Sequence, residues 1–148
     1  MVLLGPAHRV AVHGLALPGV ESFATPLGEV ALDLPAMESI SHLPQVVVSD
    51  AVHAQEHALE VQLPFLQAVL DDFTLVPLVV GSASPEEVAQ VLDILWGGPE
   101  TLLVISSDLS HYLPYGAAEV KDLDSVQHIL QLDGSLTHSQ ACGATPVN

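Results

Sequence analysis

The chain has 148 residues, 49% of them hydrophobic and 14% charged, a composition typical of one packed globular domain and not of a disordered chain. Eighteen acidic residues stand against only Arg9 and Lys121, and the resulting formal charge of −16 disfavours nucleic acid and anionic membrane surfaces as partners. The apolar runs are shorter than the roughly 20 residues of a membrane span. The N-terminus lacks a secretory pattern, and the single Cys142 cannot form an internal disulfide. We therefore expect a cytoplasmic protein.

Most of the expected strands are continuous apolar runs, the kind that lies buried on both faces of a parallel sheet. They cover Val2–Leu4, Gln45–Val48, Thr74–Val80 and Thr101–Ile105. The segment from Arg9 to Ser41 is rich in proline and glycine, with short extended pieces around Val10–Val12, Leu15–Leu17 and Glu29–Leu32. It predicts a loop or small β excursion laid over one end of the sheet.

Helices are predicted between these strands. Ser84 as N-cap, Pro85 at the first helical position and Glu87 at the third mark one helix, which Gly97 ends. Leucines at helical spacing follow residue 58, and there Pro64 must either bend the helix or lie where its missing N–H does no harm.

Two more helices are expected nearer the C-terminus. One covers Ala118–Leu132, and a capping-box pattern at 137–140 would begin another just before Cys142. Strands that alternate with helices predict a single α/β domain over residues 1–148, a layered sandwich with a mostly parallel sheet flanked by helices.

Polar side chains follow two of the strands. His8 comes just after the first, and Ser106, Ser107, Asp108 and His111 follow the fourth. Ligands of open α/β sheets bind beyond the carboxyl ends of the strands, where Asp108 could accept a hydrogen bond or hold a cation and His111 could move a proton.

Each candidate also has a structural interpretation. Asp108 can cap a turn, His8 can be a hydrogen-bonded loop histidine, and Cys142 can be a small buried apolar residue. Glu56 and His57 can form a pair at a helix N-terminus, where the helix dipole favours the carboxylate. Taken singly, none of these residues defines a function.

The residues 53–57, HAQEH, match the H-x-x-E-H pattern of the inverted zinc metallopeptidases. That mechanism requires His53 and His57 one turn apart inside a helix, together with a distant third ligand. Because His53 closely follows SDAV and Pro64 disturbs the helix soon after, a zinc peptidase is only a remote alternative.

Six segments together resemble the bacterial members of the Memo family, also called AmmeMemoRadiSam system protein B. In chain order they are LLGPAHRV, FATPLGEVALD, HAQEHALEVQLPFLQ, PLVVG, VISSDLSHY and ACGATPVN. Any one of them is weak evidence, but their order and compatible spacing make the resemblance specific.

The resemblance implies a fold like that of class III extradiol dioxygenases, with a mononuclear non-haem metal. By position, His8 of the GPxH motif and Cys142 would be metal ligands, for iron or copper more than for zinc. His111 of SSDxxH would be the catalytic acid or base, and Asp108 its orienting partner. HAQEH resembles the family's own E-H-[SA]-L-E helix start, so Glu56 and His57 would line the cleft, as would Ser107.

The family's PHAG-type metal-binding segment should precede GPxH, but the chain begins at Met1, shortly before His8, and stops at Asn148, where the family continues. We therefore expect the chain to cover the middle of a longer domain, incomplete at both ends and lacking one metal ligand. The face of the sheet that the missing elements would cover would then be an exposed apolar surface, which favours a homo-oligomer.

The sequence leaves two main hypotheses. The first is a metal-dependent oxidoreductase of dioxygenase type acting on an unknown small molecule. The second is a non-catalytic scaffold that binds a protein or peptide.

Overall fold

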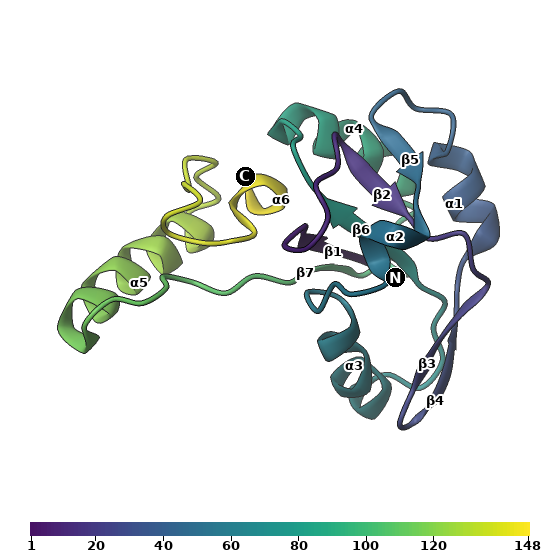
Figure 1. Ribbon diagram of the computed structural model, residues 1–148, viewed down its shortest axis with the longest axis horizontal. Helices are drawn as coiled ribbons and strands as arrows, with labels where there is room; N and C mark the ends of the chain where they lie inside the picture. Colours follow the sequence, from purple (N-terminus) through teal and green to yellow (C-terminus); the bar gives the residue numbers. More distant parts are fainter.

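A computed structural model describes all 148 residues, which form a five-stranded central sheet with strand order β5-β2-β6-β1-β7 and a separate two-stranded hairpin (Figure 1). The sheet strands are β1 (Val2–Pro6), β2 (Leu15–Leu17), β5 (Val46–Val48), β6 (Val76–Val80) and β7 (Leu103–Ile105), and the hairpin strands are β3 (Ser22–Thr25) and β4 (Gly28–Ala31).

The sheet is mostly parallel, as predicted. β1 runs parallel to both β6 and β7, and β2 runs parallel to β5, whereas β2 and β6 are antiparallel. Every residue of β1 and β6 is buried, which explains why these strands read as continuous apolar runs. The parallel arrangement brings the C-terminal ends of β1 and β7 to the same edge.

Helices flank the sheet. They are α1 (Leu34–Ile40), α2 (Asp50–His53), the 3-10 turn η1 (Glu60–Gln62), α3 (Leu63–Val69), α4 (Pro85–Leu95), α5 (Tyr115–Leu130) and α6 (Ala144–Val147). The predicted capping box is present in α4: the side chain of Ser84 accepts from the Glu87 N–H, and the Glu87 carboxylate accepts from the Ser84 N–H. Pro64 lies in the first turn of α3, where its missing N–H does no harm.

The prediction for residues 9–41 was wrong in part. Leu15–Leu17 is a fully buried strand inside the main sheet, between β5 and β6, and the Asp33 side chain caps an unpredicted helix, α1. Only the β3–β4 hairpin is an excursion. Leu15–Leu17 was expected to be extended, but three apolar residues carry too little local signal to place them in the main sheet, where β5 and β6 hold the strand.

The helix expected from the pattern at 137–140 is absent. The Gln140 side chain accepts the Thr137 N–H, as in half of a capping box, but the chain makes only one turn. It then changes direction because the Cys142 N–H bonds to the Asp108 carbonyl. A contact with the β7 exit thus takes the place of the helix.

The core is one cluster of 22 buried apolar residues, centred on the sheet and including Leu3, Leu78 and Val91. In Figure 1, α5 lies apart from this body, and only Ser125 among its residues is buried. None of the helices combines the length and the apolar character needed to cross a membrane.

Candidate functional site

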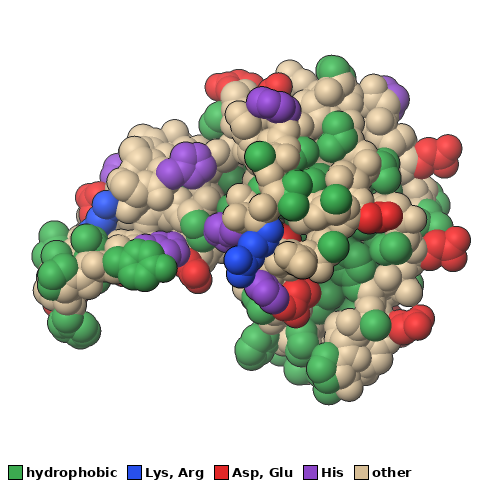
Figure 2. All heavy atoms as spheres, in the orientation of Figure 1, with side chains coloured by type: hydrophobic (Ala, Val, Ile, Leu, Met, Phe, Trp, Pro, Cys, Tyr) green, Lys and Arg blue, Asp and Glu red, His purple; other side chains and the backbone are tan.

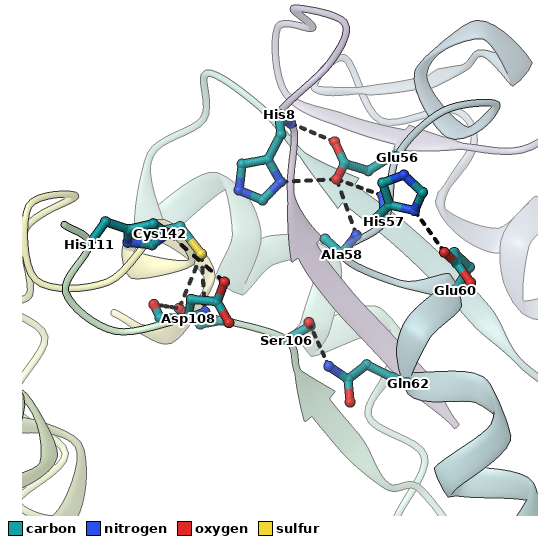
Figure 3. Close-up of polar contacts among 11 residues, drawn as sticks. His8, Glu56, His57, Ala58, Glu60, Gln62, Ser106, Asp108, His111 and Cys142 are labelled. Atoms are coloured by element: carbon teal, nitrogen blue, oxygen red, sulfur yellow. Dashed lines mark hydrogen bonds and ion pairs between the residues drawn. The ribbon is translucent and has the colours of Figure 1, made fainter.

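A cavity of about 380 Å³ lies where β1 and β7 end. It brings together residues from distant parts of the sequence (Figure 3). Of the residues proposed from sequence, six line it: His8, Glu56, His57, Ser107, Asp108 and Cys142.

His8 follows β1 directly and is held by Glu56. Its backbone N–H donates to Glu56 Oε2 at 2.5 Å, and its ring Nδ1 lies 2.9 Å from Glu56 Oε1. Because an ionised carboxylate only accepts, Nδ1 carries the hydrogen, and in the neutral form of the ring Nε2 keeps its lone pair. Nε2 has no hydrogen-bond partner in the protein, so it is free to contact a ligand.

Glu56 is a buried charge, with only 3% of its side chain exposed. Burial raises its pKa, but hydrogen bonds from the N–H and ring of His8 and from the N–H of Ala58 outweigh this effect and lower the pKa to about 2. Oε1 also accepts the N–H of His57 at 2.9 Å. Glu56 is thus ionised at neutral pH and fixes the orientation of His8.

The β7 exit supplies the opposite wall. Ser106 is buried, and its hydroxyl accepts from Gln62 Nε2 at 3.0 Å, which ties η1 to β7. The Ser107 hydroxyl accepts the Gly143 N–H at 2.9 Å. Gly143 is needed for this close approach, because a Cβ at that position would come within 2.8 Å of Ser107 Cβ.

Asp108 and Cys142 are joined in both directions. The Asp108 N–H donates to Cys142 Sγ at 3.1 Å, and the Cys142 N–H donates to the Asp108 carbonyl at 3.1 Å. Ser107 Oγ lies 3.7 Å from the same sulfur. The thiol is half-buried, and the end of β7 therefore fixes its position at the cavity wall.

His111 is not among the residues that line the cavity. Its Nε2 lies 3.9 Å from Asp108 Oδ2, too far for a hydrogen bond, and 86% of the Asp108 side chain is exposed. The pair expected from SSDxxH thus sits together at the rim of the cavity, with the backbone of Asp108 better fixed than its carboxylate.

The side chains present do not by themselves fit a mononuclear metal centre. His8 Nε2 and Cys142 Sγ are suitable donors for iron or copper, but no three His, Cys, Asp or Glu side chains are placed to hold one ion. The helix required by the zinc-peptidase alternative is also missing, because α2 ends at His53 and His57 lies beyond it, outside any helix.

Two polar residues of the cavity were missed from the sequence. Arg9 lines it beside His8, and Gln62 reaches it from η1. Arg9 carried a signal, since it is one of only two basic residues in the chain and directly follows the GPxH histidine. Gln62 carried none, because its role depends on the packing of η1 against β7.

These features define a mixed α/β protein with a His/Cys-lined cavity at the strand ends of a mostly parallel sheet. The family model described as Memo-like protein matches residues 1–144, and the chain belongs to this family.

Curated relatives include a MEMO1 family protein of Archaeoglobus fulgidus, 37% identical over 144 residues, which are 89% of this chain and 52% of the relative. A MEMO1 family protein of Ignicoccus hospitalis is 33% identical over 142 residues, covering 90% of this chain and 49% of its own length. A MEMO1 family protein of Saccharolobus islandicus is 34% identical over 142 residues, which are 90% of this chain and 50% of the relative. The chain thus spans about half the length of the curated relatives it matches.

Proposed function

We propose that the cavity at the ends of β1 and β7 is a Memo-type ligand site that binds a small organic anion, such as a carboxylate. The observation that carries the proposal is the position of Arg9. In a chain with 18 acidic residues, Arg9 is an exposed residue that lines the cavity and makes no ion pair or hydrogen bond with any of them. A planar fork of donors suits a carboxylate, which it can bind through two hydrogen bonds.

The acidic residues of the cavity do not cancel this attraction. The charge of Glu56 is compensated by the N–H groups that point at it, and the Asp108 carboxylate is exposed to water, which screens it. Beside Arg9, His8 presents the lone pair of Nε2, which can accept a proton or a hydrogen bond from the ligand. His111 at the rim would serve as a second proton donor or acceptor.

The family resemblance adds a metal to this proposal. His8 Nε2 and Cys142 Sγ are the donors of this chain that would hold iron or copper, but two donors fall short of a complete site. We therefore derive no reaction step through a metal. A dioxygenase-type oxidoreductase activity stays a prediction that depends on metal binding, and analogy of fold alone does not support it.

Titration with benzoate tests the anion site, followed through the amide signals of the protein by NMR. We expect shifts at residues 8–9, 56–58, 106–108 and 142. Arg9→Gln should weaken binding about tenfold, because a charge-assisted pair is lost. Lys121→Gln is the matched control: it removes the only other basic side chain and should leave the affinity unchanged. Equal loss of benzoate affinity in both variants would mean that only the net charge of the protein matters, and it would overturn the proposal.

Elemental analysis of untagged protein purified without oxygen tests the metal separately. Near-stoichiometric iron or copper that disappears in Cys142→Ala would assign a metal to the cavity with Cys142 as a ligand. Its absence from both proteins would leave the anion site as the function and end the oxidoreductase prediction for this chain.

A second candidate, a non-catalytic scaffold, is favoured by the outer face of α5. Val120 is 71% exposed, Leu123 59% and Leu130 78%, and these residues recur at helical spacing. A second copy of the chain would bury this face. Light scattering should show a dimer that Leu123→Glu dissociates, whereas Gln131→Glu, which adds the same charge just after the helix, should not. A monomeric wild type would rule out a second copy of the chain as the partner of this face.

A further inference from the structure

A second and larger cavity, about 520 Å³, adjoins the first, because Glu56 and His57 line both. We call it the hairpin cavity, since residues 22–26 of the β3–β4 hairpin form one wall and residues 50–64, from α2 to α3, form another. Phe23 and Leu63 contribute apolar surface from the two walls. The cavity can therefore hold the apolar body of a small molecule.

The charges around the hairpin cavity are all negative. Asp50, Glu56 and Glu60 line it, and no lysine or arginine does. Asp50 Oδ1 accepts the Gly19 N–H at 2.6 Å, and Glu60 Oε1 lies 2.7 Å from His57 Nδ1. The second oxygen of each of these two carboxylates has no partner in the protein. Acidic side chains are also scattered over the face seen in Figure 2, where basic ones form only small patches.

His53 adds an acceptor to this lining. Its Nε2 lies 2.9 Å from the Ala16 carbonyl, so Nε2 carries the hydrogen. Burial lowers the pKa of His53, against the opposing effects of the Ala16 hydrogen bond and the nearby carboxylates, and the ring is neutral at pH 7. Nδ1 is then a lone-pair acceptor without a protein partner. The ring lies beside Phe23, with centroids 6.1 Å apart.

We propose that the hairpin cavity binds a small organic cation, a protonated primary amine attached to an aromatic or aliphatic body. The ammonium group has only donors, which matches the unused oxygens of Asp50 and Glu60 and Nδ1 of His53. The body would pack against Phe23 and Leu63. An organic anion would meet the carboxylates of Asp50 and Glu60 and no basic side chain, so the lining selects against it.

This inference does not rest on the proposed function. The two adjoining cavities differ in charge, one with Arg9 and the other without any basic residue, and each can be tested with its own probe. If both sites hold, their shared wall at Glu56 and His57 would let one ligand with an anionic and a cationic end occupy both.

Phenethylamine is the probe, used at pH 7 and followed by amide NMR shifts. Its matched comparisons are 2-phenylethanol, which lacks the charge, and 3-phenylpropionate, which reverses it. We expect the amine to shift residues 22–26 and 50–57 and to bind about tenfold more tightly than the alcohol. The carboxylate should cause no shifts at the hairpin.

Asp50→Asn removes the charge but keeps an oxygen for the Gly19 N–H, and it should weaken amine binding about tenfold. Asp93→Asn, on the exposed side of α4, removes the same charge elsewhere and should have no effect. Glu60→Gln is the second variant, to be used if Asp50→Asn does not fold. Cys142→Ala, which disturbs the first cavity, should leave amine binding unchanged.

Two results would overturn the proposal. One is equal affinity for the amine and the alcohol, which would make the cavity a purely apolar site. The other is an equal loss of amine affinity in Asp50→Asn and Asp93→Asn, which would mean that the amine binds unspecifically as a counterion. Either result leaves the benzoate titration of the first cavity unaffected, so failure here is distinguishable from failure of the proposed function.

Discussion

Asp108 and Cys142 hold each other by two hydrogen bonds, one from the Asp108 N–H to the sulfur and one from the Cys142 N–H to the Asp108 carbonyl, both 3.1 Å long. This exchange fastens the C-terminal segment to the end of β7. It explains why the position of the thiol depends on the strand exit and not on a helix of its own. The sulfur is therefore part of the structure as well as of the candidate site.

Replacing Cys142 tests this dual role. Cys142→Ala removes the acceptor for the Asp108 N–H, and because that N–H is near solvent, we expect a loss of only about 0.5–1 kcal/mol in the free energy of unfolding. Cys142→Ser keeps an acceptor and should recover part of the loss. Urea denaturation measures both variants. A serine variant as unstable as the alanine variant would show that the hydrogen bond to sulfur does not stabilise the segment.

Glu56 predicts a pH dependence of stability. Its pKa falls from 4.5 to about 2 on folding, so the folded state favours the ionised form. This contribution, on the order of 3 kcal/mol, is fully present above pH 4.5 and is lost as the pH falls toward 2. Glu56→Gln should therefore be less stable than the wild type at pH 7, and the difference should shrink below pH 4.5.

Glu60→Gln is the control for this prediction. Glu60 also faces a histidine ring, His57, but 57% of its side chain is exposed, so its removal should cost little at any pH. Urea midpoints from pH 7 down to pH 3 would measure all three proteins. A constant gap between wild type and Glu56→Gln over this range would contradict the buried, ionised carboxylate.

The sequence predicted the parts of the fold that carry strong local signals. β1 and β6 are short, continuous apolar runs, which are typical of buried strands. The capping box of Ser84 and Glu87 marked the start of α4. The extended conformation of Leu15–Leu17 was expected, but its place inside the main sheet was missed, because only the neighbouring strands β5 and β6 determine it. The turn at 137–140 failed to become a helix because a tertiary contact of Cys142 replaced the next helical hydrogen bonds.

In the candidate site, too, some residues could be placed from local sequence signals, and others depend on tertiary contacts. Residues directly after a buried strand, such as His8 and Ser107, could be placed at the sheet edge from topology alone. The anchoring of His8 by Glu56 could not, because it joins two loops far apart in sequence. The hairpin cavity was also invisible, since its walls meet only when the β3–β4 hairpin packs beside α2 and α3.

His53 should be a neutral Nε2–H tautomer at pH 7. Its pKa lies below 6.5 because burial disfavours the charged ring, although Ala16, Asp50 and Glu56 act in the opposite direction. Ring ¹⁵N NMR reports both the tautomer and the titration. We expect protonation only below pH 6.5, with a loss of stability that begins as the unfolded chain takes up a proton first. A ring protonated at pH 7 would remove the Nδ1 acceptor from the hairpin cavity.

Gly143 should tolerate no side chain, because a Cβ there would lie 2.8 Å from Ser107 Cβ and 2.9 Å from the Ser106 carbonyl oxygen. Gly143→Ala should lower the free energy of unfolding by about 1–3 kcal/mol, since backbone on both sides must shift. It should also weaken benzoate binding, because Ser107 and Cys142 would move apart.

Gly116→Ala is the control for Gly143→Ala. Nothing lies within 4 Å of its Cβ position in α5, and there alanine should stabilise by up to about 1 kcal/mol. Opposite signs for the two changes in urea denaturation would support the close contact, and similar effects would refute it.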